Sequence, residues 1–450
     1  MDGIGPAGER RSVAVIGAGI SGLAAAWLLR ERHAVTLYEA EPRLGGHADT
    51  QVVTVGGVEV AVDTGFIVYN TLNYPHLTAF FDTLGIATEP SDMSFGVSIG
   101  PDRTGGGRLE YGGGSLRQLF AQKRNLARPR FLLMLRDTLR FYREAPRLLE
   151  TDDAPSLGAY LDRGGYGPGF VEDHILPMGA AIWSASVSAM REFPARSFIR
   201  FFVNHGLLRL KDRPLWRTVT GGSRRYVARV EAALGGGVRK GVPVASVARG
   251  SGGVTVTLAD GTAARHDAVI LATHGDAALR LLRDPSPEER RVLGAVRTQA
   301  NRMVLHTDAR LMPRRRGVWS SWNYLARDSA DHGRKVSLTY WMNRLQNLVT
   351  SEPLLVTLNP LAEPDPARVL LEKTYRHPCY DAAMIDAQAA LGRLQGRRGT
   401  WFCGAWTGYG FHEDGIASAV AAARAFGVSP PWAAATEGAM ARPATEAAAA

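Results

Sequence analysis

The sequence predicts an α/β fold in which a domain with a parallel sheet is interrupted by a second, α+β domain. Three observations lead to this prediction: a strand, glycine turn and helix near residue 17, an apolar segment with strand character near residue 270, and a strand, loop and helix near residue 404. The chain has 450 residues, of which 45% are hydrophobic and 21% charged. A chain of this length and composition buries a large core and usually divides into two or three domains.

The first element is a strand followed by a glycine loop and a helix. The strand is 13–16, the helical stretch continues to Arg30, and the loop between them reads Gly17, Ala18, Gly19, Ile20, Ser21 and Gly22. Such a turn directs backbone N–H groups and the positive end of a helix dipole at a pyrophosphate, and its glycines let the phosphates come close. The glycines also interrupt the apolar run, so we do not interpret it as a signal peptide.

The second strand, 34–38, ends in Glu39, which lies 22 residues after Gly17. A carboxylate at this position accepts hydrogen bonds from a ribose diol and disfavours a 2′-phosphate, so NADP is not expected. NAD and FAD share this pattern, and the next segment discriminates between them.

That next segment reads Ala40, Glu41, Pro42, Arg43, Leu44, Gly45, Gly46 and His47. Its Arg-x-Gly-Gly pattern resembles the second phosphate-contacting element of glutathione-reductase-type FAD enzymes, especially those of the flavin amine oxidase and phytoene desaturase superfamily. The resemblance implies a FAD-binding Rossmann domain of that type with an amine oxidase-like substrate domain. Arg43 would supply a cation, and the paired glycines would let the backbone approach the cofactor, with Ala40, Leu44 and His47 beside it.

Three further segments resemble cofactor-contacting parts of the same superfamily. Asp63-Thr64-Gly65-Phe66 is similar to the D-x-G segment that passes beside the flavin, and Val244 to the valine that meets the adenine. Residues 266–273 resemble the strand that returns to the nucleotide domain. The resemblance therefore implies cofactor contacts at Thr64, Gly65, Phe66, Val244 and Thr273.

The late segment runs from Trp401 through Gly404 to Gly415 and leads into an Ala-rich helical run, 416–426. In the superfamily this is where the FAD site closes, and the helix N-terminus can stabilise negative charge on the reduced flavin. The resemblance implies cofactor contacts at Gly404, Ala405, Glu413, Asp414, Gly415 and Ile416, and this interpretation is preferred to a purely structural turn in which Asp414 caps the helix. His412, which ordinarily titrates near neutrality, and Glu413 are the candidate catalytic residues.

The resemblance covers about 13–426 and is strongest to a bacterial group of predicted NAD/FAD-binding proteins related to amine oxidases. Members are often associated with cyclopropane-type fatty acid synthases, and some with desaturation of methylated fatty acids. This implies hydride transfer from a methylated or modified fatty acyl chain to flavin. Two alternatives stay open: a flavin amine oxidase acting on a soluble amine, and a flavin-bound, membrane-associated protein without turnover.

The expected FAD-binding domain combines 11–75, 218–275 and 395–427, and the expected substrate domain combines 76–217 and 276–394. Residues 1–10 and 428–450 lack a periodic apolar pattern and are expected to be disordered tails.

The net charge of +10 is concentrated in two segments of the expected substrate domain. Residues 115–149 and 190–225 each carry nine basic and two acidic residues, so the rest of the chain is net −4. Such segments form either solvated faces or surfaces for anionic lipid, and the acyl substrate favours the second. Nucleic acid is not an expected partner, because no zinc-finger or RNP pattern accompanies the charge.

Two cysteines, Cys379 and Cys403, are too few for a disulfide framework or a thiolate metal site, and we expect no metal. So few cysteines favour a cytoplasmic protein. No apolar run is long enough to span a bilayer, and attachment to the inner face of the membrane is left open. The Cys379-Tyr380 pair resembles the context in which some amine oxidases attach FAD covalently, but an inert thiol is the preferred interpretation.

Overall fold

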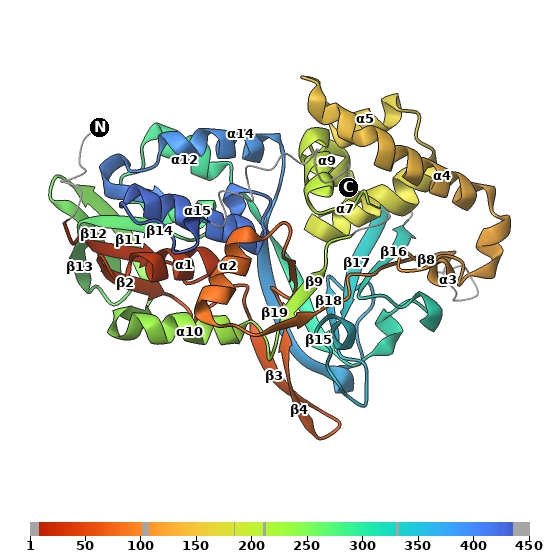
Figure 1. Ribbon diagram of the computed structural model, residues 1–450, viewed down its shortest axis with the longest axis horizontal. Helices are drawn as coiled ribbons and strands as arrows, with labels where there is room; N and C mark the ends of the chain where they lie inside the picture. The colour runs from red at the N-terminus through yellow and green to blue at the C-terminus, as the bar shows by residue number, and fades with distance from the viewer. Residues whose placement is uncertain (1–8, 101–107, 184, 210–212, 330–332, 435–450) are drawn as a thin grey trace.

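The protein, described here from a computed structural model covering residues 9–100, 108–183, 185–209, 213–329 and 333–434, consists of two lobes that lie side by side (Figure 1). One lobe contains the parallel sheet with α1, α10, α12, α14 and α15. The other contains a long antiparallel sheet beneath α4, α5, α7 and α9.

The first lobe is built on a five-stranded parallel sheet in the order β10-β2-β1-β14-β20. Its strands are β1 (Ser12–Ile16), β2 (Ala34–Glu39), β10 (Val238–Lys240), β14 (Ala268–Leu271) and β20 (Thr400–Phe402). Every residue of β14 is buried. A parallel strand covered on both faces is expected to be apolar throughout, which explains this sequence. The mixed α/β prediction is confirmed.

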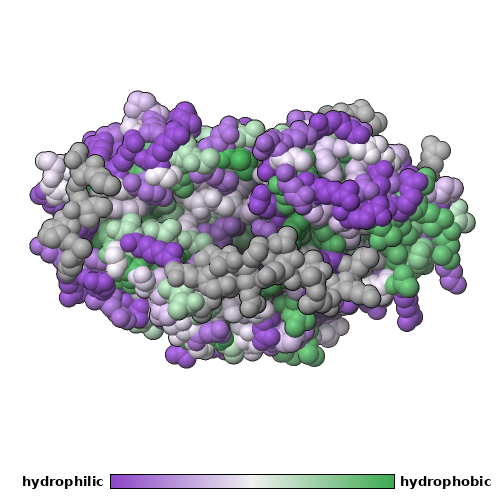
Figure 2. Space-filling view, turned by 45° about the horizontal axis from the view of Figure 1, so that its top comes forward, coloured by the Kyte–Doolittle hydropathy of each residue, from purple (hydrophilic) through white to green (hydrophobic). Residues whose placement is uncertain are grey.

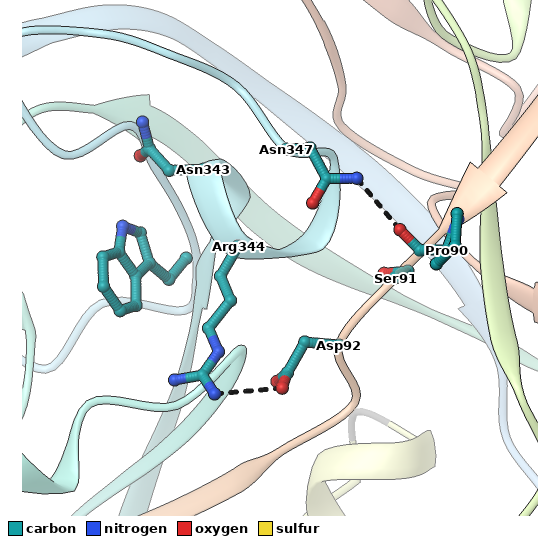
Figure 3. Close-up of a pocket in the computed structure, with 7 residues that line it drawn as sticks. Pro90, Ser91, Asp92, Asn343, Arg344 and Asn347 are labelled. Atoms are coloured by element: carbon teal, nitrogen blue, oxygen red, sulfur yellow. Dashed lines mark hydrogen bonds and ion pairs between the residues drawn. The ribbon is translucent and has the colours of Figure 1, made fainter.

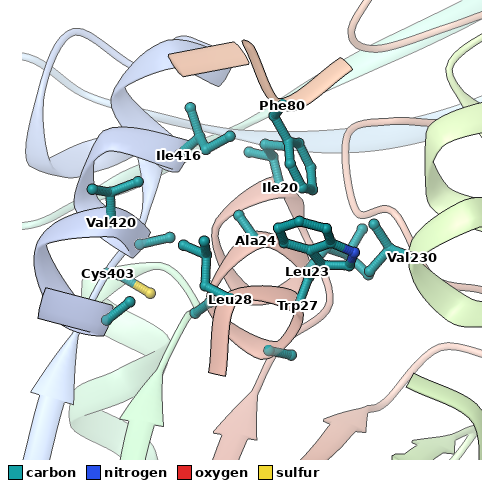
Figure 4. Packing of buried hydrophobic residues seen from close by; sticks show 14 of the residues in the cluster. Ile20, Leu23, Ala24, Trp27, Leu28, Phe80, Val230, Cys403, Ile416 and Val420 are labelled. Carbon is teal, nitrogen blue, oxygen red and sulfur yellow. The ribbon is translucent and has the colours of Figure 1, made fainter. Parts of the chain in front are cut away.

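Helix α1 (Ile20–Leu29) lies at the centre of this lobe, and all ten of its residues are buried. It packs against α15 (His412–Ala425) and α10 (Arg224–Leu234), and its Trp27 ring lies 5.4 Å from Phe80 of α2 (Pro75–Leu84). Figure 4 shows Trp27 and Ile20 of α1 among Phe80, Ile416 and Val420. Because α1 has no polar face, its position over the sheet is determined by packing on every side.

The second lobe is built on a seven-stranded sheet in the order β19-β15-β18-β17-β16-β7-β8, in which only the β16–β7 pair is parallel. The strands are β7 (Phe95–Ile99), β8 (Leu109–Gly112), β15 (Thr298–His306), β16 (Trp322–Ser329), β17 (Gly333–Trp341), β18 (Leu355–Leu358) and β19 (Val369–Pro378). Its helices include α3 (Leu116–Leu119), the 3-10 helix η1 (Lys123–Ala127), α4 (Pro129–Glu144), α5 (Leu157–Arg163), α7 (Leu176–Trp183) and α9 (Ala195–Asn204). Buried residues of β7, β8, β16 and β17 share one apolar cluster with buried residues of α4, α5, α7 and α9.

Smaller elements complete the two lobes. They are the hairpin β3 (Thr50–Val55) and β4 (Val58–Asp63), the short sheet β5 (Tyr69–Asn70), β9 (Trp216–Val219) and β6 (Thr88–Pro90), the sheet β11 (Val244–Gly250), β12 (Gly253–Leu258) and β13 (Ala263–His266), and the helices α12 (Pro287–Gly294), α13 (Met342–Leu345) and α14 (Ala382–Ala390). Among the residues that the structure describes, no helix combines the length and the apolar character that crossing a bilayer would require.

The C-terminal stretch corrects one expectation from the sequence. Residues 428–434 do not behave as a disordered tail, because Val428 and Trp432 are buried and the Trp432 ring stacks on Trp27 at 6.2 Å. The Trp432 indole N–H also donates to His76 at 3.1 Å. A single tryptophan produces no periodic pattern, so the sequence had no signal for this contact. Of the remaining predicted tail residues, 1–8 and 435–450 lie outside the described part of the chain, and Glu9 and Arg10 are exposed.

Candidate functional site

Three loops predicted from separate motifs are joined by backbone hydrogen bonds beside the carboxyl ends of β1 and β2. The N–H of Gly45 donates to the Ala18 carbonyl at 2.8 Å, and the N–H of Phe66 donates to the His47 carbonyl at 2.7 Å. The glycine loop, the Arg-x-Gly-Gly segment and the D-x-G segment therefore form one continuous backbone surface. The carboxyl edge of a parallel sheet is the usual ligand site in such folds.

The three glycines of the first loop have different structural roles. Gly17 has a φ of +99°, and a Cβ on Gly22 would lie 1.8 Å from the Gly17 carbonyl oxygen. A Cβ on Gly19 would meet no atom within 4 Å. Gly17 and Gly22 are thus required by the turn itself, whereas Gly19 faces open space, as a residue must if a phosphate is to come close to the backbone. Ile20 and Ser21 begin α1, whose N-terminus points toward the same side.

Glu39 ends β2 and bonds back to the glycine loop. One carboxylate oxygen accepts the Ala18 N–H at 2.7 Å, and the other accepts the Glu41 N–H at 2.9 Å. Ala40, between them, is exposed. The structure therefore places the predicted ribose-binding carboxylate next to the predicted phosphate loop.

Arg43 holds its own loop closed. Its guanidinium donates to the Gly46 carbonyl at 2.9 Å and pairs with Asp49 at 3.1 Å, while Leu44 is buried beneath it. Burial acts to raise the pKa of Asp49, but hydrogen bonds from Lys373 and a nearby tyrosine, with the Arg43 charge, lower it below its ordinary value. Sequence reasoning did not identify Asp49, because its partner Lys373 is 324 residues away.

His47 lies in a cluster of rings that the sequence did not reveal. Its ring centroid is 5.4 Å from His377, 6.2 Å from His274 and 5.2 Å from Tyr375. Burial, followed by the nearby imidazoles, lowers the pKa of His47 to about 3, so its ring is neutral. Its Nε2 atom is buried and makes no hydrogen bond within the described part of the chain. A buried polar atom of this kind normally has a partner, so His47 fits a site that a ligand completes.

Hydrogen bonds from distant parts of the chain hold the D-x-G segment in place. Asp63 is buried and accepts hydrogen bonds from Ser223 and Gln346, and burial raises its pKa. Thr64 bonds to the hydroxyl of Tyr375 at 2.7 Å. A Cβ on Gly65 would lie 2.2 Å from the His47 carbonyl oxygen, so this close approach of the two loops requires glycine.

Helix α15 brings the late motif to the same place. A Cβ on Gly415 would lie 2.7 Å from the Ile20 side chain, so α15 and α1 touch at their N-termini. The Phe411 N–H donates to Asp414 at 2.9 Å, which confirms the capping interpretation, and burial raises the pKa of Asp414 to about 6. Ile416 is fully buried behind them. Two positive helix ends therefore converge on the loops.

The preceding loop is tied to the strand that returns at β14. The Trp406 indole N–H donates to the Thr273 carbonyl at 3.0 Å, and the Gly404 N–H donates to the Ser418 hydroxyl at 3.0 Å. Ala405 lies between these two anchors at the start of a short 3-10 helix.

His412 stacks on Phe66, with ring centroids 3.6 Å apart, and its Nε2 lies 3.1 Å from the Tyr226 hydroxyl. The sequence led us to expect that His412 titrates near neutrality. That expectation is wrong: burial, with a contribution from His47, lowers its pKa to about 3. The imidazole is therefore neutral at physiological pH and cannot act there as an acid.

Glu413 binds the N-terminus of α2. Its two carboxylate oxygens accept the N–H groups of His76 at 3.0 Å and Leu77 at 2.9 Å. Burial raises the pKa of Glu413 to about 7, although these two bonds oppose the shift. Glu413 thus has a structural contact that the sequence did not predict.

Two predicted positions lie outside this group of contacts. Val244 begins β11. The contact of this segment with Glu39 is made two residues earlier, where the Val242 N–H donates to the Glu39 carbonyl at 3.1 Å. Cys379 is partly buried, and burial raises the pKa of its thiol, while Tyr380 is packed against Gly410.

Aromatic side chains of α9 and of the loop before α15 contact one another. We define the aromatic wall as Phe201 and His205 of α9 with Tyr409 and Phe411 of the loop before α15. Phe201 stacks on Phe411 at 5.0 Å and lies 5.8 Å from Tyr409, and His205 lies 5.5 Å from Phe411. Since Phe411 directly precedes His412, this wall adjoins the convergent loops.

A separate surface cavity of about 520 Å³ lies beside α13 (Figure 3). It is lined by Pro90, Ser91, Asp92, Trp341, Asn343, Arg344 and Asn347. Asp92 pairs with Arg344 at 3.0 Å, and Asn347 donates to the Pro90 carbonyl at 2.9 Å. Its polar groups are thus largely used within the protein, and none of the predicted site residues lines it.

The family model described as flavin containing amine oxidoreductase matches residues 20–426. No curated protein matches the chain in sequence. Among solved structures, cyclohexylamine oxidase from Brevibacterium oxydans IH-35A aligns with a TM-score of 0.65 and 16% identity, over 93% of this chain and 98% of that one. The CLA-producing fatty acid isomerase from P. acnes aligns with a TM-score of 0.63 and 16% identity, over 92% and 98%. Putrescine oxidase bound to putrescine aligns with a TM-score of 0.63 and 17% identity, over the same shares.

At these identities the solved structures establish the fold, and the family match establishes the relationship and the cofactor. The chain belongs to the flavin containing amine oxidoreductases and is an FAD-dependent oxidoreductase.

Proposed function

We propose that this oxidoreductase removes hydrogen from a fatty acyl chain, methylated or otherwise modified, and passes it as hydride to FAD. The observation that carries the proposal is the aromatic wall beside the convergent loops. The two carboxylates of this region, Glu413 and Asp414, are both bonded to backbone N–H groups. These bonds hold both carboxylates at the N-termini of α2 and α15, whereas the rings of the aromatic wall offer an apolar chain an apolar surface.

The cofactor contacts are part of the proposal. The backbone at Gly19 and the N-terminus of α1 would bind the pyrophosphate, and Glu39 would bind the ribose. The N-terminus of α15 would face the flavin, and the unpartnered Nε2 of His47 would bond to the cofactor. The division into an FAD-binding domain and a substrate domain at the predicted boundaries belongs to the same proposal.

Forming a C=C bond removes two hydrogens, one as hydride and one as a proton. When bound, FAD supplies the acceptor for the hydride. Glu413 is the candidate acceptor for the proton, because a carboxyl group with a pKa of about 7 is partly ionised near neutrality. His412, neutral and stacked on Phe66, is a candidate positioning residue that holds this ring beside the reacting carbon.

The fatty acid isomerase from P. acnes shares the fold, which is consistent with an acyl substrate for this chain. Amine oxidation is the second candidate, because the matching family and two of the solved structures are named for amine substrates.

Anaerobic titration of the FAD-loaded protein tests these candidates. We expect methylated or cyclopropane phospholipids to bleach the visible absorbance of bound FAD, with a product that has lost two hydrogens by mass spectrometry. Putrescine and cyclohexylamine should leave the absorbance unchanged. Bleaching by the amines, with hydrogen peroxide released on re-oxidation, would instead identify an amine oxidase. A His412→Ala variant with unchanged turnover and flavin spectrum would remove His412 from the mechanism.

An acyl substrate of this kind is held in a lipid bilayer, so we also propose a cytoplasmic protein that works at the membrane surface.

A further inference from the structure

Leucines project into solvent from α3, η1 and α4. The exposed fractions are 76% for Leu116, 58% for Leu126, 45% for Leu132, 47% for Leu133 and 53% for Leu139. We call these five side chains the docking face. Figure 2 shows a hydrophobic patch, bordered by hydrophilic residues, at the end of the molecule where Figure 1 places α3 and α4. A group of exposed leucines on neighbouring elements is unusual for a solvated surface and marks an interaction site.

These leucines are not displaced core residues. Helix α4 already buries Phe131, Met134, Asp137 and Phe141, which follow one another at helical spacing. Leu132 and Leu139 are seven residues apart and lie on the opposite, exposed side. The helix therefore has apolar side chains on two faces, and the described residues of the protein cover only one of these faces.

Cations surround the docking face. Arg117 and Lys123 are exposed and form no ion pair within the described part of the chain. Arg136 and Arg143 have exposed side-chain fractions of 67% and 71%, although each contacts an adjacent carboxylate. Residues 115–149 keep a net charge of +7. The positive potential is therefore concentrated where the leucines are exposed.

The second basic segment, 190–225, has a different arrangement. Its helix α9 buries Phe198, Ile199, Phe201 and Phe202. Arg191 pairs with a carboxylate at 2.6 Å, and Arg196 and Arg217 donate to backbone carbonyls. Leu215, 80% exposed, is the one leucine of this segment that the described residues leave largely exposed, whereas the first segment has five such leucines among its exposed cations.

We propose that the docking face binds an anionic lipid bilayer, with the leucines in the interfacial region and the cations at the headgroups. Interleaved leucines and basic side chains match a surface that is apolar below and anionic above. That the protein takes an acyl substrate from this bilayer rests on the proposed function. The docking itself rests only on the exposed leucines and charge.

Vesicle flotation of the FAD-loaded full-length protein tests the docking. We expect binding to vesicles of phosphatidylglycerol and phosphatidylcholine, and little binding to phosphatidylcholine alone. Each cation that is removed, as in Arg117→Gln or Lys123→Gln, should weaken binding about fivefold. The pair Leu132→Ser and Leu139→Ser should weaken it about tenfold or more. Leu72→Ser is the matched control, because Leu72 is 56% exposed but precedes α2 in the chain and is not part of the docking face, and it should bind like the wild type.

Equal binding to anionic and neutral vesicles, or leucine variants that float like the wild type, would overturn the proposal. A second measurement separates this failure from failure of the proposed function. In detergent micelles, the docking-face variants should still allow acyl lipid to bleach FAD anaerobically, because no bilayer is needed there. Absence of bleaching in micelles by a protein that floats normally would refute the acyl substrate and leave the docking intact.

Discussion

Replacing Gly19 or Gly22 by alanine should separate cofactor binding from folding. A Cβ on Gly19 meets no protein atom within 4 Å, and the φ of −71° is accessible to alanine. We expect the Gly19→Ala apoprotein to unfold at the same temperature as the wild type. If the FAD pyrophosphate lies against Gly19, the added methyl group costs about 1–3 kcal/mol in the complex, and FAD affinity falls about tenfold to a hundredfold.

Gly22→Ala should instead destabilise the apoprotein itself. Its Cβ would lie 1.8 Å from the Gly17 carbonyl oxygen, so the backbone of the loop must move. Overpacking of this severity costs about 3 kcal/mol or more, which lowers the Tm of a chain of this size by about 3–4 °C even without cofactor. Calorimetry of the apoprotein and fluorescence titration with FAD measure both quantities. A Gly19→Ala variant that binds FAD as tightly as the wild type would refute the placement of the pyrophosphate.

Three other changes test separate parts of the structure. Burial raises the pKa of Glu413 from 4.5 to about 7, so its contribution to stability is greatest below pH 4.5 and is lost as the pH rises through about 7. The difference in unfolding free energy between wild type and Glu413→Gln should therefore change over this range, by up to about 3 kcal/mol, and denaturant titrations with no change would contradict the shift. Arg249→Met should destabilise the protein by about 3–5 kcal/mol, because it leaves the buried Glu289 carboxylate without its cation, while the flavin spectrum stays the same. Burial raises the pKa of the Cys379 thiol, which disfavours the thiolate, the form that would bond to a flavin. Acid precipitation should therefore release all yellow colour from the wild type. Colour retained by the wild type but lost by Cys379→Ser would instead show a covalent bond.

The sequence by itself determined the parts of the site whose requirements are local. A tight turn between strand and helix needs glycine where φ is positive or a Cβ would collide with the backbone, and Gly17 and Gly22 meet that requirement within six residues. The run of apolar residues in β14 likewise indicates a strand that is covered on both faces. Such requirements are visible in a pattern because all the interacting atoms belong to neighbouring residues.

Only the tertiary structure decided the charge states and the partners of the candidate catalytic residues. His412 was expected to titrate near neutrality, but its pKa depends on burial beneath Phe66 and Tyr226, which no local pattern encodes. Glu413 bonds to the N-terminus of α2, more than 330 residues earlier in the chain.

The same distinction applies to the basic segments and to the C-terminus. Residues 115–149 and 190–225 carry equal charge and similar apolar content, yet among the described residues the first exposes five leucines and the second only Leu215. Trp432, in a stretch without periodicity, is buried against α1. Composition shows how many apolar and charged groups a segment has. Which of them are covered depends on long-range packing, because burial and Coulomb energy depend on neighbours in space and not on neighbours in sequence.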